Sequence, residues 1–146
     1  MTTATTSQDT KRPAGRSPGD PDVVTVRYQT ANLDRAIGFY TKVLDFKVEL
    51  RSGAALAIVS HGPLLLLLSG PGSSGARPMP DGRRQEAGGW NRILIYVPDL
   101  VARIDALRKA GVHFRNEIEQ GPGGSQILID DPDGNPIELH EAPKRS

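Results

Sequence analysis

A chain of 146 residues is long enough for one domain with a buried core, and its lack of cysteine excludes a disulfide framework and a thiolate metal site. The 18 Lys and Arg residues nearly balance the 17 Asp and Glu residues, so no strongly basic surface for nucleic acid is expected. No apolar run approaches the roughly 20 residues of a membrane span, and the N-terminus lacks the apolar segment of a secretory signal. We therefore expect a cytoplasmic protein with neither a nucleic-acid nor a membrane partner.

Residues 1–22 are rich in Thr, Ser, Pro, Gly and charged residues. This composition buries too little apolar surface to offset the entropy of ordering, so we predict a disordered tail. A transit peptide is the alternative, but such peptides form amphipathic, Arg-rich helices and no such pattern is visible.

The first half of the chain predicts one helix between short strands. Residues 23–30 alternate between apolar and polar side chains, as a half-buried strand does. Asn32 precedes an apolar stripe at helical spacing, which indicates an N-capped helix. Further strands are predicted at residues 47–51, 54–60 and 64–68, and the last of these is apolar on both faces, which indicates burial on both sides.

Residues 70–89 are rich in Gly, Pro and Arg and predict a linker or a mobile loop over a site. The pattern then restarts. A strand is predicted at residues 92–97, followed by a helix that is capped by Asp99 and ended by Gly111. The remaining strands are predicted at residues 112–114, 126–129 and 137–140.

The two halves form an internal repeat. With an offset of 67 (100 − 33), the caps Asn32 and Asp99 coincide, and so do the apolar positions of the first strands and of the helices. This period exceeds that of solenoid repeats and indicates a duplicated module. We predict an α+β domain over residues 23–142. It consists of two tandem βαβββ modules, 23–69 and 90–142, joined by residues 70–89, and its curved mixed sheet forms a cup-shaped cavity for a ligand.

The last predicted hairpin carries the most suggestive polar pair. Asp131, Pro132 and Gly134 occupy the first, second and fourth positions of a type I turn between two apolar runs. In the strand that follows, Glu138 and His140 share one face. A carboxylate and an imidazole placed in this way can bind a metal, hold a polar ligand or transfer protons. The alternative is that they form the solvated side of a half-buried strand.

Two motifs resemble a known superfamily. Residues 32–46 read NLDRAIGFYTKVLDF, and residues 131–139 read DPDGNPIEL. Together with the segment VPDL at residues 97–100 and the duplicated modules, they resemble the vicinal oxygen chelate superfamily, which includes glyoxalase I, extradiol dioxygenases and the fosfomycin- and bleomycin-resistance proteins. The motifs are specific for the fold and much less specific for an activity.

The resemblance implies one divalent metal in the cup, held by His, Gln or Glu side chains from the first and last strands of each module. The corresponding positions here are Thr25, Arg92, Glu138 and a residue near Leu65. Only Glu138 is a suitable ligand, and a guanidinium repels a cation. We therefore expect no metal cofactor and predict an Arg92–Glu138 ion pair, with a solvent-exposed arginine as the alternative. A further departure is Asp45, where the superfamily commonly has glycine.

Strand alternation places polar side chains on the sheet face opposite the helices, where they converge on the predicted cup. Glu138 and His140 are the predicted catalytic residues if the protein is an enzyme, because histidine titrates near neutral pH. This face suits a small organic molecule with carbonyl, carboxylate or amide groups and an apolar body. A solvated face without specific function is the alternative. The predicted ligand-binding residues are Thr25, Arg27, Gln29, Arg92, Tyr96 and Gln126.

Three functions are compatible with these residues. The lost metal ligands favour a metal-independent binding protein of the bleomycin-resistance kind. The alternatives are a lyase, isomerase or dioxygenase acting on a small carbonyl- or hydroxyl-bearing substrate, and an interaction module without catalytic activity.

We expect a homodimer, because modules in this superfamily pair within one chain or between chains. His61 and His113 are predicted to be solvated, and Trp90 is predicted to be a stacking wall or a core or interface residue.

Overall fold

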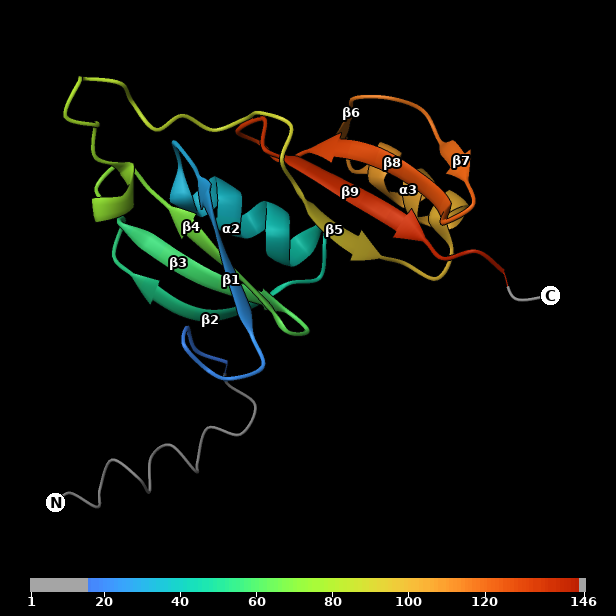
Figure 1. Ribbon diagram of the computed structural model, residues 1–146, viewed down its shortest axis with the longest axis horizontal. Coiled ribbons are helices and arrows are strands. Elements are labelled where there is room, and N and C mark those ends of the chain that lie inside the picture. Colours follow the sequence, from blue (N-terminus) through green and yellow to red (C-terminus); the bar gives the residue numbers. More distant parts are fainter. Residues whose placement is uncertain (1–15, 145–146) are drawn as a thin grey trace, which may run out of the picture.

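The computed structural model describes residues 16–144. Two modules lie side by side, and the linker between them crosses above both (Figure 1). No helix in this part of the chain is long and apolar enough to span a membrane. Of the predicted tail, residues 1–15 lie outside the described residues. Residues 16–22 form turns, and the backbone N–H of Arg16 donates to Glu49 Oε1 at 3.1 Å.

Module one contains one helix and four strands: β1 (Val24–Gln29), α2 (Leu33–Lys42), β2 (Lys47–Ser52), β3 (Leu56–His61) and β4 (Leu64–Ser69). The sheet order is β1-β4-β3-β2, with β1 parallel to β4 and the other neighbours antiparallel. Central strand β4 is buried over most of its length, as its apolar run predicts.

Module two contains one helix and five strands: β5 (Ile93–Tyr96), α3 (Leu100–Lys109), β6 (His113–Phe114), β7 (Glu119–Gly121), β8 (Gly124–Asp130) and β9 (Pro136–Glu141). The order is β5-β9-β8-β6, and β7 also pairs with β8. β5 is parallel to β9, which repeats the β1–β4 relationship of module one. The α+β class and the two tandem modules are therefore confirmed, with the strands arranged in two sheets.

Both helices begin where the sequence predicts. Asn32 Oδ1 accepts a hydrogen bond from Arg35 N, and Asp99 Oδ1 accepts one from Ala102 N. After α2, Phe46 N donates to Tyr40 O at 2.9 Å, and Asp45 adopts a left-handed conformation with φ of 62°. This is a helix C-terminus of the kind that favours glycine, which gives the Asp45 departure a physical cost.

The two modules share one hydrophobic core. Apolar side chains from α2, α3 and the inner faces of both sheets pack in a single buried cluster. The predicted turn after β8 is confirmed by a hydrogen bond from Gly134 N to Asp131 O at 3.0 Å. Burial raises the pKa of Asp131 despite the hydrogen bonds it accepts from Tyr40 and Asn135, and this carboxylate lies at the centre of the contact between modules.

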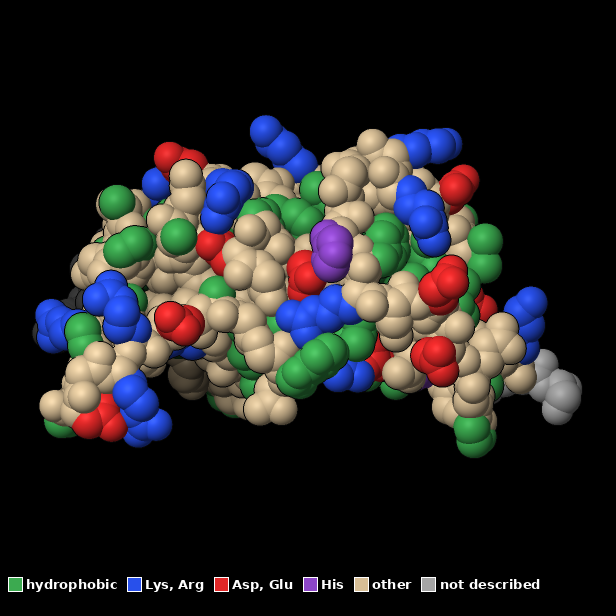
Figure 2. Space-filling model, turned by 90° about the horizontal axis from the view of Figure 1, so that it is seen from above, with side chains coloured by type: hydrophobic (Ala, Val, Ile, Leu, Met, Phe, Trp, Pro, Cys, Tyr) green, Lys and Arg blue, Asp and Glu red, His purple; other side chains and the backbone are tan. Residues whose placement is uncertain are grey.

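The linker between the modules is fixed at both ends. It contains a short 3-10 helix, η1 (Ser74–Ala76), and Gln29 Nε2 donates to the carbonyl oxygen of Gly75 at 2.8 Å. At the far end, Gly88 N donates to Asn135 Oδ1 at 2.9 Å. On the linker side of the molecule, basic, acidic and apolar side chains are intermixed (Figure 2).

Candidate functional site

A chain of hydrogen bonds from Arg92 through Glu138 and His140 to the Gly123 carbonyl lies on the face of the second sheet opposite the hydrophobic core. Arg92 donates from Nε and Nη2 to Glu138 Oε1, at 3.1 and 2.9 Å. The other carboxylate oxygen, Oε2, lies 3.0 Å from His140 Nδ1, and His140 Nε2 lies 2.8 Å from the carbonyl oxygen of Gly123. The predicted ion pair between Arg92 and Glu138 is thus present.

The carboxylate and the imidazole of this chain are both buried, so the pKa of each depends on the other. Glu138 is 5% exposed and His140 is 9% exposed, so neither is well solvated. Burial raises the pKa of Glu138, but the hydrogen bonds from His140 and Arg92 outweigh it, and the net pKa lies below its ordinary value. The hydrogen bond to Glu138, followed by that to Gly123, raises the pKa of His140. Because both ring nitrogens face acceptors, they can both donate only in the imidazolium form.

Two other predicted residues adjoin this chain. The ring of Tyr96 packs 5.0 Å from the ring of His140, and Gln126 lies opposite His140 in the β8–β9 register. Tyr96 and its neighbour Leu94 are 63% and 43% exposed, so the face offers apolar area beside the buried charges. It can therefore contact a ligand with both polar and apolar parts.

Arg92 also belongs to a pocket between β1 and β5. This pocket has a volume of about 350 Å³, and Arg27, Gln29 and Arg92 all line it. Within residues 16–144, the Arg27 guanidinium has no carboxylate partner. Its Nη1 donates to Ser69 Oγ at 3.2 Å, and it lies so close to Gly75 that a β-carbon there would clash with it. The linker thus holds Arg27 in place at the pocket.

The predicted site residues therefore fall into two groups that Arg92 connects. Glu138, His140, Tyr96 and Gln126 lie on the second sheet, whereas Arg27 and Gln29 lie on β1. Thr25 is exposed on β1 and lines neither this pocket nor the charged chain. Among the pocket residues that were not predicted, three have polar side chains on loops, where no periodic pattern fixes the side-chain direction: Glu86, Asn91 and Asn135.

One of the two expectations for histidines is wrong. His113 is exposed, as predicted, and its Nδ1 lies 2.8 Å from Asp130 Oδ2. His61 was expected to be solvated, but it is half-buried with its ring 5.2 Å from that of Phe46. Trp90 is 69% exposed, and the Arg115 guanidinium lies over its ring at 4.7 Å. The error for His61 arises from a tertiary contact that the sequence pattern does not contain.

Most of the chain matches the model of one protein family. A family model described as the Glyoxalase/Bleomycin resistance protein/Dioxygenase superfamily matches residues 22–139. The chain belongs to this superfamily. No curated protein matches the chain.

Solved structures from the superfamily share this fold. Lactoylglutathione lyase from Agrobacterium tumefaciens has 22% identity and a TM-score of 0.66, over 84% of this chain and 95% of that chain. TnmS3, an antibiotic binding protein from Streptomyces sp. CB03234, has 21% identity and a TM-score of 0.66, over 87% and 100%. A superfamily member from Sphaerobacter thermophilus DSM 20745 has 25% identity and a TM-score of 0.65, over 82% and 95%. At these identities the likeness concerns the fold.

The metal that the superfamily implies does not fit the residues at the corresponding positions. Strand pairing matches Val26 with Leu66 and Ile93 with Ile137, so the counterpart of Glu138 in module one is Leu67, two residues from the position estimated from sequence. Leucine donates no ligand atom at either position. Oε1 of Glu138 already accepts from the Arg92 guanidinium, and Oε2 lies 3.0 Å from His140 Nδ1. In the described chain, no group of three His, Cys, Asp or Glu side chains is arranged to hold a metal ion.

Proposed function

We propose that this protein binds a small organic molecule without a metal ion, as a binding protein of the bleomycin-resistance kind. The observation that supports this most directly is that each carboxylate oxygen of Glu138 is engaged by another side chain, Oε1 by the Arg92 guanidinium and Oε2 by His140 Nδ1. A carboxylate engaged in this way is a poor metal ligand, and the neighbouring guanidinium adds repulsion.

The pocket between β1 and β5 supports a ligand that carries an oxygen acceptor. Arg27 presents donors without a carboxylate partner in the described chain, and Arg92 keeps donors that Glu138 does not use. The apolar surface of Leu94 and Tyr96 lies near Glu138 and His140 on the same sheet face. A carbonyl or carboxylate group on an apolar body matches this combination.

Metal content tests the metal-independent part of the proposal. Protein purified without chelators is analysed for Zn, Mn, Fe and Ni by mass spectrometry, before and after incubation with each ion followed by desalting. We expect far less than one metal per chain in both samples. One tightly bound ion per chain would contradict the proposal.

Ligand binding tests the pocket. A panel of apolar carboxylic acids and ketones is screened by thermal shift, and hits are measured by calorimetry. Gly75→Ala displaces Arg27, so it should weaken such ligands by about tenfold, the effect of one charged hydrogen bond. Gly72→Ala is the matched control, because a β-carbon there meets nothing within 4 Å. Equal affinities in the two variants would remove Arg27 from the site.

A second candidate is an acid–base enzyme of the lyase, isomerase or dioxygenase kind. The buried contact between Glu138 Oε2 and His140 Nδ1 favours it, because a carboxylate beside an imidazole can exchange a proton with a substrate. This function requires a ligand to displace either the Gly123 carbonyl or Arg92. Turnover that His140→Gln abolishes while ligand affinity is retained would favour the enzyme over the binding protein.

The assembly and the location belong to the same proposal. We expect a homodimer and a cytoplasmic protein, and light scattering coupled to size-exclusion chromatography measures the first. A monomer at every concentration would contradict the expected dimer while leaving the pocket between β1 and β5 intact.

A further inference from the structure

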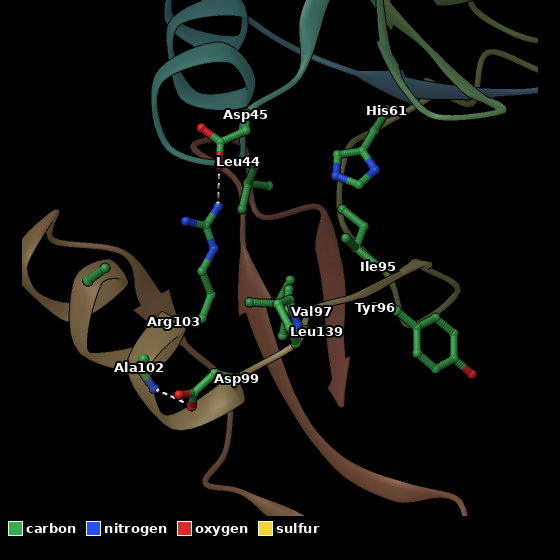
Figure 3. A pocket seen from close by; sticks show the side chains of 12 residues that line it. Leu44, Asp45, His61, Ile95, Tyr96, Val97, Asp99, Ala102, Arg103 and Leu139 are labelled. Carbon is green, nitrogen blue, oxygen red and sulfur yellow. Dashed lines mark hydrogen bonds and ion pairs between the residues drawn. The ribbon is translucent and has the colours of Figure 1, made fainter. Parts of the chain in front are cut away.

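A second pocket lies at the other end of the contact between the modules. It has a volume of about 430 Å³ and is bounded by the turn between β3 and β4, the loop after α2, and the junction between β5 and α3. Its lining is mostly apolar, with Ile95, Val97 and Leu139 lying together and His61 and Arg103 on opposite sides (Figure 3). None of the predicted catalytic residues lines it.

The internal repeat explains why this pocket exists. In module one, two tyrosines reach across to module two. Tyr28 donates to Pro136 O at 2.7 Å, and Tyr40 donates to Asp131 Oδ2 at 2.7 Å. With the offset of 67, their counterparts in module two are Ile95 and Leu107. Neither counterpart has a ring or a hydroxyl group.

In each module, a turn of the other module approaches the junction between the first strand and the helix. The two turns differ in length and in their contacts. The turn between β8 and β9 has five residues, and its Asp133 accepts hydrogen bonds from Thr30 and Arg35. The turn between β3 and β4 has only two residues. The counterparts of Thr30 and Arg35 are Val97 and Ala102, which offer no side-chain donor. Hydrogen bonds therefore dock a turn onto the junction of module one, and the counterpart junction, here called the open junction, has no such contact in the described part of the chain.

Some polar side chains around the open junction have hydrogen-bond partners, and His61 does not within residues 16–144. Arg103 contacts Asp45 Oδ2 at 3.3 Å and donates to Val43 O, and Asp99 caps α3. In contrast, the ring nitrogens of His61 make no hydrogen bond within residues 16–144, although the ring is half-buried. Two carboxylates against one guanidinium disfavour an anionic ligand here, whereas a neutral hydroxyl group can either donate to or accept from the imidazole.

From this geometry we propose that the open junction is a second ligand site, which takes a small neutral phenol. The ring packs against Ile95, Val97 and Leu139, where Ile95 stands at the position that Tyr28 has in module one. The hydroxyl group hydrogen-bonds to His61. This site is separate from the pocket at Arg27 and Arg92 and does not depend on the function proposed for that pocket.

The probe is p-cresol, which has the shape of a tyrosine side chain, with toluene and 4-methylbenzoate as comparisons. Binding is followed by changes in amide chemical shifts in the full chain. We expect saturable changes at His61, Val97 and Ala102. One neutral hydrogen bond should make p-cresol about fivefold tighter than toluene. The anion should bind more weakly than p-cresol. Absence of saturable changes, or changes centred on Arg27 and Arg92, would overturn the proposal.

Variants locate the site independently. Ala106→Phe places in α3 the ring that Phe39 has at the corresponding position of α2, and it should weaken p-cresol at least about tenfold by filling the pocket. Val101→Phe is the control, because Val101 is 68% exposed on the same helix and does not line the pocket. Equal affinities in both variants would contradict this location.

His61→Phe keeps a ring beside Phe46 but removes the hydrogen bond. It should abolish the preference for p-cresol over toluene while leaving toluene affinity unchanged. A preserved preference would show that His61 does not recognise the hydroxyl group. Arg27→Met should leave p-cresol affinity unchanged, which separates this site from the pocket between β1 and β5.

Discussion

The hydroxyl group of Tyr28 lies 2.7 Å from the carbonyl oxygen of Pro136, so a side chain of β1 completes the backbone hydrogen bonding of β9. The same hydroxyl accepts from Ile93 N at 3.0 Å. Tyr28→Phe leaves both backbone groups buried without this partner, and we expect it to lower the free energy of unfolding by about 1–3 kcal/mol. Urea denaturation measures this loss. Tyr96→Phe is the control, because Tyr96 is 63% exposed and should change stability little.

The Arg92–Glu138 pair gives a double-mutant test. Arg92→Met leaves the buried Glu138 carboxylate with His140 as its remaining side-chain partner, and we expect a loss of about 1–3 kcal/mol in unfolding free energy. Adding Glu138→Met to this variant should restore much of the loss, because no buried carboxylate then lacks its guanidinium partner. Denaturant unfolding of the four proteins measures the coupling. Additive losses would show that the two side chains do not depend on each other.

Stability should depend on pH through Glu138 and His140. The pKa of Glu138 lies below its ordinary value of 4.5, so its contribution is present above pH 4.5 and is lost as the pH falls through the lower, folded pKa. The pKa of His140 lies above its ordinary value of 6.5, so its contribution is present below pH 6.5 and is lost as the pH rises through the higher, folded pKa. Both contributions are complete only between these ordinary values.

His140→Gln isolates this dependence from that of other groups, such as Asp131. The difference in unfolding free energy between the native protein and the variant should be largest between the ordinary values of 4.5 and 6.5 and should shrink at higher pH. Thermal denaturation across the pH range measures it. A difference that stays constant from about pH 5 to about pH 9 would contradict the raised pKa of His140.

The left-handed conformation of Asp45 predicts a stabilising substitution. Asp45→Gly removes the steric cost of φ at 62° and should raise the free energy of unfolding by about 1 kcal/mol. The substitution also removes the contact with Arg103, but Asp45 has a 76% exposed side chain there and the pair contributes little. Asp45→Asn is the control, because it removes the charge and keeps a residue that tolerates this conformation. A destabilised glycine variant would contradict the argument.

The fold was largely predictable because its signals are local and repeated. Asn32 and Asp99 cap the two helices at equivalent positions, and strand alternation places Glu138 and His140 on one face. The strand β7 was missed because Glu119–Gly121 has no apolar alternation and is followed by a Gly-rich turn. Missing it also hid the Gly123 carbonyl that accepts from His140.

The candidate site was only partly predictable, for a different reason. The Arg92–Glu138 pair follows from repeat position and strand face, both of which are properties of one module. The contacts of Tyr28, Tyr40 and His61 depend on how one module lies against the other, and no periodic pattern encodes that arrangement. The pocket beside His61 is lined by residues of both modules, so it too depends on that arrangement.

In each module the first strand pairs with the last, β1 with β4 and β5 with β9. During synthesis on a ribosome, β1 therefore has no partner until residues 64–69 have emerged, and module one can then close before module two exists. At that stage the hydroxyl groups of Tyr28 and Tyr40 still lack their acceptors, Pro136 O and Asp131 Oδ2, which lie close to the C-terminus. A nascent first half thus contains two tyrosine hydroxyl groups that only the last hairpin can supply with their native acceptors.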